Sequence, residues 1–240
     1  ILTSMTAESV KQQVVSFGNP QKAEHSKYFF KTGKGQYGEG DRFIGSTVPE
    51  TRKVAKANKN LSFDEIGKLL NDEYHECRFC ALVILSEQFE KACDTGRKEI
   101  FEFYLAHTHG INNWDLVDVS AYHIVGEWLL DKDRSVLYQL ASSENLWEQR
   151  IAIISTLAFI RKKDFTDTLK LAEKFLTHRH DLMHKACGWM LRETGKRDEK
   201  TLTCFLDAHY TEMPRTMLRY AIEKLSPEQK KKYMMKEVQN

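Results

Sequence analysis

The spacing of the apolar residues constrains this chain most, because they recur three and four positions apart through nearly all of its 240 residues. This period puts them on one face of an α-helix, and no segment alternates apolar and polar residues as a half-buried strand does. Only 4 prolines and 12 glycines interrupt the pattern, and the abundant Leu, Ala, Glu and Lys favour helices. The sequence therefore predicts an all-α fold.

Helix-start and helix-stop residues divide the chain into short helices. Two helices are expected within 4–32, separated by Gly18-Asn19-Pro20, and a glycine-rich connection follows at 33–41. Pro49 falls near the first position of the next helix, where its missing N–H costs little. Capping boxes are expected at Ser62 with Glu65 and at Ser226 with Gln229. Between them we expect helices at 74–91, 95–107, 114–130, 133–141, 146–161, 165–177, 181–194, 199–208 and 214–223.

The connections between these helices are only a few residues long, so successive helices must run antiparallel. Helix pairs recur at intervals of roughly 35–40 residues without a tight sequence signature, which favours a HEAT-like stack over a closed bundle. We therefore expect residues 1–240 to form a single domain, a right-handed α-solenoid of HEAT-like antiparallel helix pairs with one long concave face.

Charge is distributed unevenly along the chain. Residues 1–149 hold 17 Lys and Arg against 22 Asp and Glu, a net −5, whereas residues 150–240 hold 19 against 12, a net +7. The C-terminal part could therefore dock a polyanion. Lys-rich helix faces that are only solvated would give the same count, so charge leaves both interpretations open.

Cysteine usage and hydropathy indicate the compartment. Five cysteines without regular spacing argue for reduced thiols and an intracellular, cytoplasmic protein. No run of 18 apolar residues is present, so no membrane span is expected. The first residues, Ile1 to Met5, lack the features of a signal peptide and suggest a truncated or renumbered N-terminus.

Several motifs that superficially suggest ligands have simpler interpretations. The glycine-rich loop at 33–41 lacks the Gly-Lys-Ser/Thr ending of a nucleotide P-loop and follows no strand. Cys77 and Cys80, just after His75, have no second pair to complete a zinc site and should pack as small buried hydrophobes. Solvated loop histidines are expected at His107, His109, His178 and His180. We expect neither a metal nor a cofactor.

The stretch from Asn112 to Leu130 carries an acidic residue on an apolar face. Asn112 or Asn113 can cap a helix there, and Asp115 suits the positive end of its dipole. On a regular helix Trp114 and Asp118 share one face, and Asp118 falls inside the apolar sector. Asp118 is either a structural acid tied to a neighbouring group or a half-desolvated carboxylate kept for chemistry.

Two later helices carry basic and aromatic residues in unusual places. Asn145 can cap a helix whose Arg150 is followed almost wholly by apolar residues, so Arg150 is either paired to an acid or directed toward an anion. Trp189 adjoins Gly188, which allows a backbone or a ligand to approach closely. The basic residues near these elements, which would complement helix ends or rim a core Trp even without a ligand, are Arg161, Lys162, Lys185, Arg192 and Lys196.

Together these segments resemble the AlkD-type DNA alkylation repair enzymes, which are DNA glycosylases built from HEAT-like repeats. The resemblance is carried by Trp114-Asp115-x-Val117-Asp118, by Asn145-x-Trp147-x-Gln149-Arg150-x-Ala152-Ile153 and by Lys185-Ala186-x-Gly188-Trp189-x-Leu191-Arg192-Glu193. The chain departs from the family where two consecutive tryptophans are common and it has Asn113-Trp114, and where Ala158 replaces a basic residue.

The resemblance implies a role for each matching position. Asp118 corresponds to the catalytic carboxylate, and Trp114 and Trp189 to aromatic walls around the damaged nucleotide. Arg150 corresponds to a contact with the DNA backbone. Further basic residues expected on a concave DNA-binding face are Arg192, Lys196, Lys185, Arg161 and Lys162.

The implied activity is that of a monofunctional DNA glycosylase. It would excise cationic alkylated purines of the N3-methyladenine and N7-methylguanine type from double-stranded DNA and leave an abasic site. The protein is expected to act as a monomer without a cofactor, metal or lysine nucleophile. The alternative from another class is a non-catalytic HEAT-like module that binds structured nucleic acid or protein.

Overall fold

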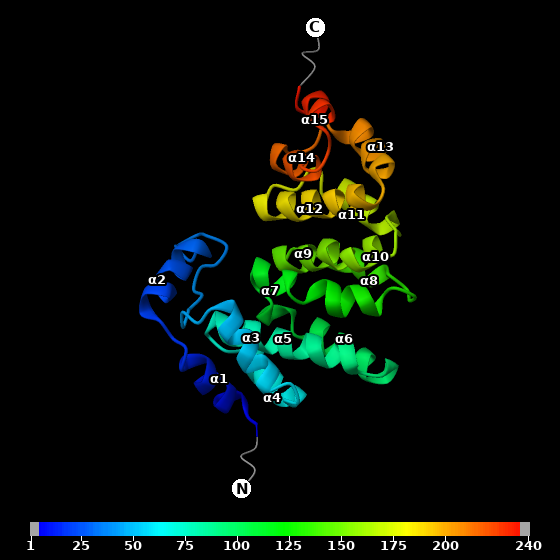
Figure 1. Ribbon diagram of the computed structural model, residues 1–240. Helices are drawn as coiled ribbons and strands as arrows, with labels where there is room; N and C mark the ends of the chain where they lie inside the picture. The colour runs from blue at the N-terminus through cyan, green and yellow to red at the C-terminus, as the bar shows by residue number, and fades with distance from the viewer. Residues whose placement is uncertain (1–4, 236–240) are drawn as a thin grey trace. The chain divides into compact units, whose positions relative to one another are not determined.

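The computed structural model describes residues 5–235, and these form helices joined by turns and loops (Figure 1). The described residues contain no strand, only an isolated bridge between Arg42 and Tyr74. The predicted all-α fold is therefore confirmed. Packing divides the chain into two compact units, one ending at Ile124 and the other beginning at Val125. Within 5–235, no helix is both long enough and apolar enough to cross a membrane.

The first unit is built around α5 (His75–Lys91), whose residues from His75 to Leu85 are all buried. A helix buried on every side needs neighbours all round. The elements of this unit are α1 (Ala7–Val15), α2 (Pro20–Phe29), α3 (Val48–Ala57), α4 (Phe63–Leu70), α5, α6 (Asp94–Ala106), the 3₁₀ turn Thr108–Gly110 and α7 (Trp114–Asp118). The helices α1, α3, α4, α6 and α7 pack directly against α5.

Helix α2 has no buried residue, so the connection that follows it must hold it in place. Gly45 has a φ of +87°, and a Cβ there would lie 2.1 Å from the backbone oxygen of Asn19, the N-cap of α2. Only glycine fits so close an approach with this dihedral. The carboxylate of Glu76 on α5 accepts hydrogen bonds from the backbone N–H groups of Ile44 and Gly45. The start of α2 is thereby fixed to the central helix.

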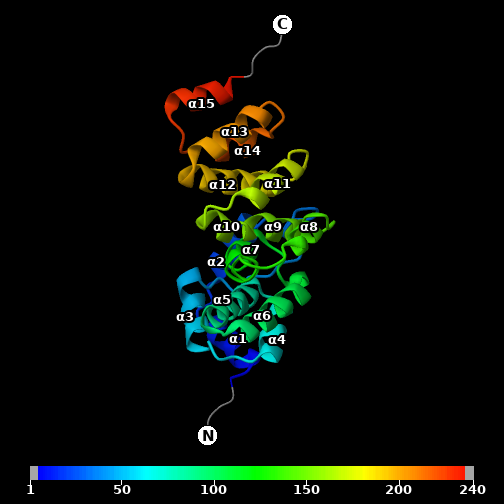
Figure 2. The ribbon, with the colours of Figure 1, turned by 90° about the vertical axis from the view of Figure 1, so that its right-hand side faces the viewer.

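The second unit stacks its helices in three layers, which both views show (Figures 1 and 2). The first layer holds α8 (Ser135–Ala141), α9 (Leu146–Ser155) and α10 (Leu157–Arg161), the second α11 (Thr166–Lys174) and α12 (Asp181–Arg197), and the third α13 (Glu199–His209), α14 (Arg215–Ala221) and α15 (Pro227–Met234). Helix α12 packs against α9 on one side and α14 on the other. This order fits the predicted series of helical hairpins. Handedness, a concave face and a single domain over 1–240 stay predictions.

The local sequence signals were right in most places and wrong in three. The capping box at Ser226 and the caps at Asn113 and Asn145 are confirmed. The helix expected at 114–130 is interrupted, because α7 ends at Asp118 and a π-helical turn follows at Tyr122–Gly126. The helix expected at 146–161 breaks at Thr156 between α9 and α10. The capping box at Ser62 is absent: the Ser62 side chain makes no cap, and the Glu65 carboxylate accepts the backbone N–H of Ala7 at 2.6 Å.

Candidate active site

The short helix α7 presents Trp114 and Asp118 to a cavity of the first unit. Asn113 begins α7 by accepting the Trp114 N–H on its Oδ1 at 2.8 Å. Leu116 and Val117 point into the core and are fully buried, so Trp114 and Asp118, one turn apart, stay half-buried. Both residues line a cavity of about 670 Å³. The predicted pairing of these two residues on one face therefore survives although the helix ends at Asp118.

The lining of this cavity combines aromatic rings with carboxylates. The aromatic contributors are Phe29, Phe30, Phe79, Trp114 and Tyr122, and the acidic ones are Glu87, Glu90, Asp115 and Asp118. Arg52 and His123 are the basic or titratable nitrogen groups in the lining. Ring faces attract cations through their quadrupoles, and the carboxylates add a negative potential. The cavity is thus suited to a flat group that carries positive charge.

Trp114 is held in place by two rings from the end of α2. Its ring lies 5.5 Å from that of Phe30 at an interplanar angle of 25°, and 5.9 Å from that of Phe29 at 64°. These are stacked and edge-on arrangements that aromatic pairs prefer. Sequence reasoning missed Phe29 and Phe30. The available signal was a pair of adjacent aromatics at the end of a helix with no apolar face of its own.

The two aspartates of α7 have different surroundings. Asp115 has both carboxylate oxygens engaged, since Oδ2 lies 2.7 Å from Nε2 of His75 and Oδ1 accepts the Leu116 N–H at 2.9 Å. Asp115 is therefore a structural acid tied to neighbouring groups. Asp118 closes the turn and lies beside Val119 and Tyr122 in the cavity lining.

In the second unit, Arg150 joins two helices. It is 4% exposed, and its Nη1 donates to the backbone oxygen of Leu182 at 2.6 Å. A guanidinium from the second turn of α9 thereby donates a hydrogen bond to a carbonyl in the first turn of α12. Trp189 lies on α12 and is half-buried. Its neighbour Gly188 admits the backbone of α14, because a Cβ at Gly188 would lie 2.6 Å from the Met217 oxygen.

The other basic residues expected to contact DNA lie on or near the surface of the second unit. Three of them pair with acids: Arg192 with Glu223, Lys196 with Glu193 at 3.1 Å and Lys185 with Asp181 at 2.8 Å. Exposed ion pairs of this kind contribute at most about 1 kcal/mol, so a phosphate can replace the acid at little cost. Arg161 and Lys162 are exposed at the end of α10.

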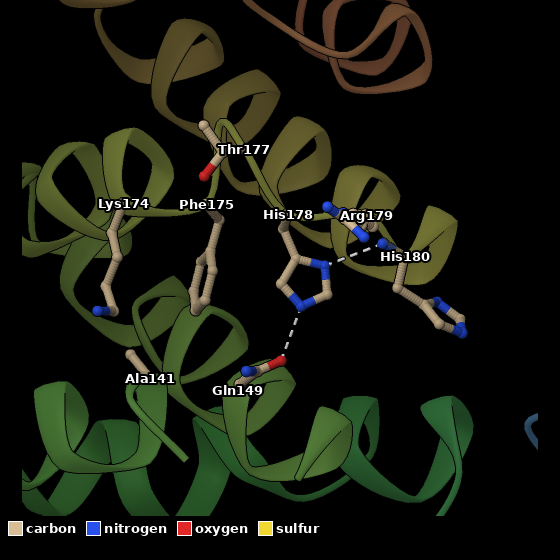
Figure 3. Close-up of a pocket in the computed structure, with 8 residues that line it drawn as sticks. All are labelled: Ala141, Gln149, Lys174, Phe175, Thr177, His178, Arg179 and His180. Atoms are coloured by element: carbon tan, nitrogen blue, oxygen red, sulfur yellow. Dashed lines mark hydrogen bonds between the residues drawn. The ribbon is translucent and has the colours of Figure 1, made fainter. Parts of the chain in front are cut away.

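The loop before α12 forms a second cavity, of about 570 Å³ (Figure 3). His178, expected to be solvated, is half-buried there. Its Nδ1 accepts the His180 N–H at 3.0 Å, so Nε2 carries the hydrogen and donates to Oε1 of Gln149 at 2.8 Å. Burial, together with the nearby His180 and His184, lowers the pKa of His178 and favours this neutral form. Its role is to order the loop between α11 and α12.

No group of three or more His, Cys, Asp or Glu side chains that could hold a metal ion occurs within residues 5–235. Cys77 and Cys80 are 0% exposed, as predicted for small buried hydrophobes, and none of the five cysteines forms a disulfide. Burial raises the pKa of the Cys80 thiol to about 12, which keeps it protonated and unreactive.

Fold and cavity define an all-helical protein with an aromatic and acidic site. The model of the DNA alkylation repair enzyme family matches residues 10–225, and the chain belongs to this family. A solved structure described as a predicted DNA alkylation repair enzyme from Enterococcus faecalis is similar, with 16% sequence identity and a TM-score of 0.68 over 88% of this chain and 97% of that chain. At this identity the likeness establishes the fold. No curated protein matches the sequence.

Proposed function

We propose that the chain is a monofunctional DNA glycosylase that excises cationic alkylated purines, of the N3-methyladenine and N7-methylguanine type, from duplex DNA. The observation that carries this proposal is the cavity in which Asp118 and Trp114 stand among further rings and carboxylates. A purine alkylated at N3 or N7 is flat and positively charged, so it matches both features of the lining. An intracellular monomer would suffice for this reaction.

The chemistry requires little more than a fixed negative charge. As the bond between the base nitrogen and C1′ breaks, its electron pair neutralises the cationic base, which leaves without needing a proton. Positive charge then develops on the sugar, and the Asp118 carboxylate stabilises it. Water adds to C1′, and its proton passes to that carboxylate and on to solvent. A preorganised charge of this kind is worth roughly 3–4 kcal/mol of barrier.

For the second unit we propose roles that follow the family resemblance. Trp189 would contact the damaged nucleotide and Arg150 the DNA backbone. The proposed phosphate contacts are Arg192, Lys196, Lys185, Arg161 and Lys162. The ion pairs of Arg192, Lys196 and Lys185 are weak enough to exchange for phosphates.

The test is base release from duplex DNA that contains 7-methylguanine. We expect free 7-methylguanine to appear in the presence of a metal chelator, while the strand stays intact until alkali cleaves the abasic site. A strand cut without alkali would contradict a monofunctional enzyme. DNA binding without base release would instead support a non-catalytic module.

A further inference from the structure

Four charged side chains form a cluster that joins α7 to its neighbours: His75, Asp115, Asp41 and Arg78. His75, the first residue of α5, is 3% exposed, and each nitrogen of its ring faces a carboxylate. Nε2 lies 2.7 Å from Oδ2 of Asp115 on α7, and Nδ1 lies 3.3 Å from Oδ2 of Asp41 at the end of the glycine-rich loop. Ionised carboxylates only accept hydrogen bonds, so both ring nitrogens must carry hydrogen and the ring is cationic.

The pKa of His75 agrees with this geometry. Burial alone would lower it, but the charge and hydrogen bond of Asp115, followed by those of Asp41, outweigh burial and raise the pKa from 6.5 to about 9. His75 therefore stays an imidazolium at neutral pH. It joins segments that lie 34 and 40 residues apart from it in the sequence.

Asp41 is held from a second side. Its Oδ1 accepts from Nη2 of Arg78 at 2.5 Å, and the Arg78 Nη1 donates to the backbone oxygen of Asp72 at 2.7 Å. Burial would raise the pKa of Asp41, but its bonds to His75 and the charge of Arg78 outweigh burial and lower it. The cluster thus pairs two cations with two anions. Asn113, the N-cap of α7, also donates to Oδ2 of Asp41 at 3.5 Å.

Stability alone does not require such a cluster, because taking charges out of water offsets much of their attraction and well-packed apolar side chains often stabilise a core as well. Charged and hydrogen-bonded partners also fix the orientation of the groups that they join. Helix α7 needs this from outside, because five residues are too few to form a stable helix by themselves. Two of its ties, through Asn113 and Asp115, lead to this cluster.

The cluster also supports Trp114 through a ring. Phe30 lies 4.7 Å from the His75 ring on one side and 5.5 Å from the Trp114 ring on the other, measured between centroids. Phe43 stacks on His75 at 5.0 Å. A movement of His75 would therefore displace both the backbone of α7, through Asp115, and Trp114, through Phe30.

We propose that His75, gripped between Asp41 and Asp115, is a positioning residue that fixes α7 and so the placement of Trp114 and Asp118 in the cavity. His75 lies behind the residues that meet the substrate and acts through Asp115 and Phe30. The claim about catalysis rests on the proposed glycosylase function, whereas the claim about α7 does not. The glycine-rich loop at 33–41 contributes as well, because it ends at Asp41 and places that carboxylate beside His75.

The test compares His75→Gln with Asp167→Asn. Glutamine retains hydrogen bonding but removes the charge between the two aspartates. Asp167 is a matched control in the second unit, because it too is buried and paired, with its Oδ2 2.7 Å from Nη1 of Arg134. Two quantities are measured in each variant: amide hydrogen exchange across residues 114–118, and the single-turnover rate of 7-methylguanine release at saturating enzyme.

We expect His75→Gln to speed exchange at 114–118 and to lower the single-turnover rate on the order of 10- to 100-fold, the scale of a misplaced catalytic group. DNA affinity should stay within about 2-fold, because His75 touches no DNA in this account. Asp167→Asn should change neither quantity, although it removes a buried ion pair. Asp167→Asn thus shows whether the loss of a buried ion pair elsewhere in the protein is enough to lower the rate.

The outcomes separate this proposal from the function on which it rests. Unchanged exchange at 114–118 in His75→Gln would overturn the positioning role, whatever the activity. Faster exchange with an unchanged release rate would overturn the catalytic part. Faster exchange in a protein whose wild type releases no base would support the role of His75 in fixing α7 and refute the glycosylase.

Discussion

The buried imidazolium predicts an unusual dependence of stability on pH. His75 has a pKa of about 9 in the folded protein against 6.5 for an unperturbed histidine. At about 1.4 kcal/mol per pKa unit, this difference corresponds to roughly 3 kcal/mol of folding free energy. Because the pKa is raised by folding, this contribution is fully present below pH 6.5 and is lost as pH rises through about 9.

Between about pH 6 and pH 8.5, the free energy of unfolding should fall by roughly 2 kcal/mol through His75 alone. Asp41 does not contribute in this range, because its lowered pKa keeps it ionised at both ends. The assay is denaturant unfolding followed by circular dichroism at each pH, for wild type and His75→Gln. Other groups titrate equally in both proteins and cancel in the difference. Equal pH dependence in the two proteins would refute a positively charged His75 between Asp41 and Asp115.

Three further predictions concern packing, capping and DNA binding. Gly188→Ala should destabilise the protein by about 1–3 kcal/mol in thermal unfolding, because the new Cβ would lie 2.5 Å from Cβ of Tyr220. The control Gly67→Ala should be tolerated, because a Cβ there meets no atom closer than 3.4 Å. Ser226→Ala should cost about 1 kcal/mol by loss of a cap, and Ser62→Ala much less because Ser62 caps nothing. Lys162→Ala should reduce the slope of log binding constant against log salt by roughly 0.9 if Lys162 contacts a phosphate, and an unchanged slope would remove it from the interface.

The sequence predicted those parts of the fold that depend on nearby residues. Asn145 caps α9 because the donor that its Oδ1 accepts from, the Trp147 N–H, lies only two residues away, and such short-range contacts can be predicted from sequence. Glu65 shows the opposite case. It stands in a capping-box position, yet it accepts a hydrogen bond from Ala7, 58 residues earlier, and tertiary structure decides between the two partners.

The candidate site divides in the same way. Trp114 and Asp118 were predictable, because one helical turn places them on a common face. Their surroundings were not predictable, since Phe30 and His75 approach from the end of α2 and from α5, and no local pattern in the sequence indicates these contacts. The interruption after Asp118 was hidden as well, because the apolar residues from Ala121 to Leu129 continue a helical spacing through the π-helical turn.

The most direct test of the central claim is the single-turnover rate of 7-methylguanine release by Asp118→Asn at saturating enzyme. Asparagine keeps the size of the side chain and removes the negative charge, so a carboxylate that stabilises the sugar cation predicts a loss of about 10²-fold or more with DNA binding intact. Asp64→Asn, which removes an exposed carboxylate of the same unit outside the cavity lining, is the matched control and should retain most of the rate. A rate in Asp118→Asn within a few fold of wild type would contradict the account.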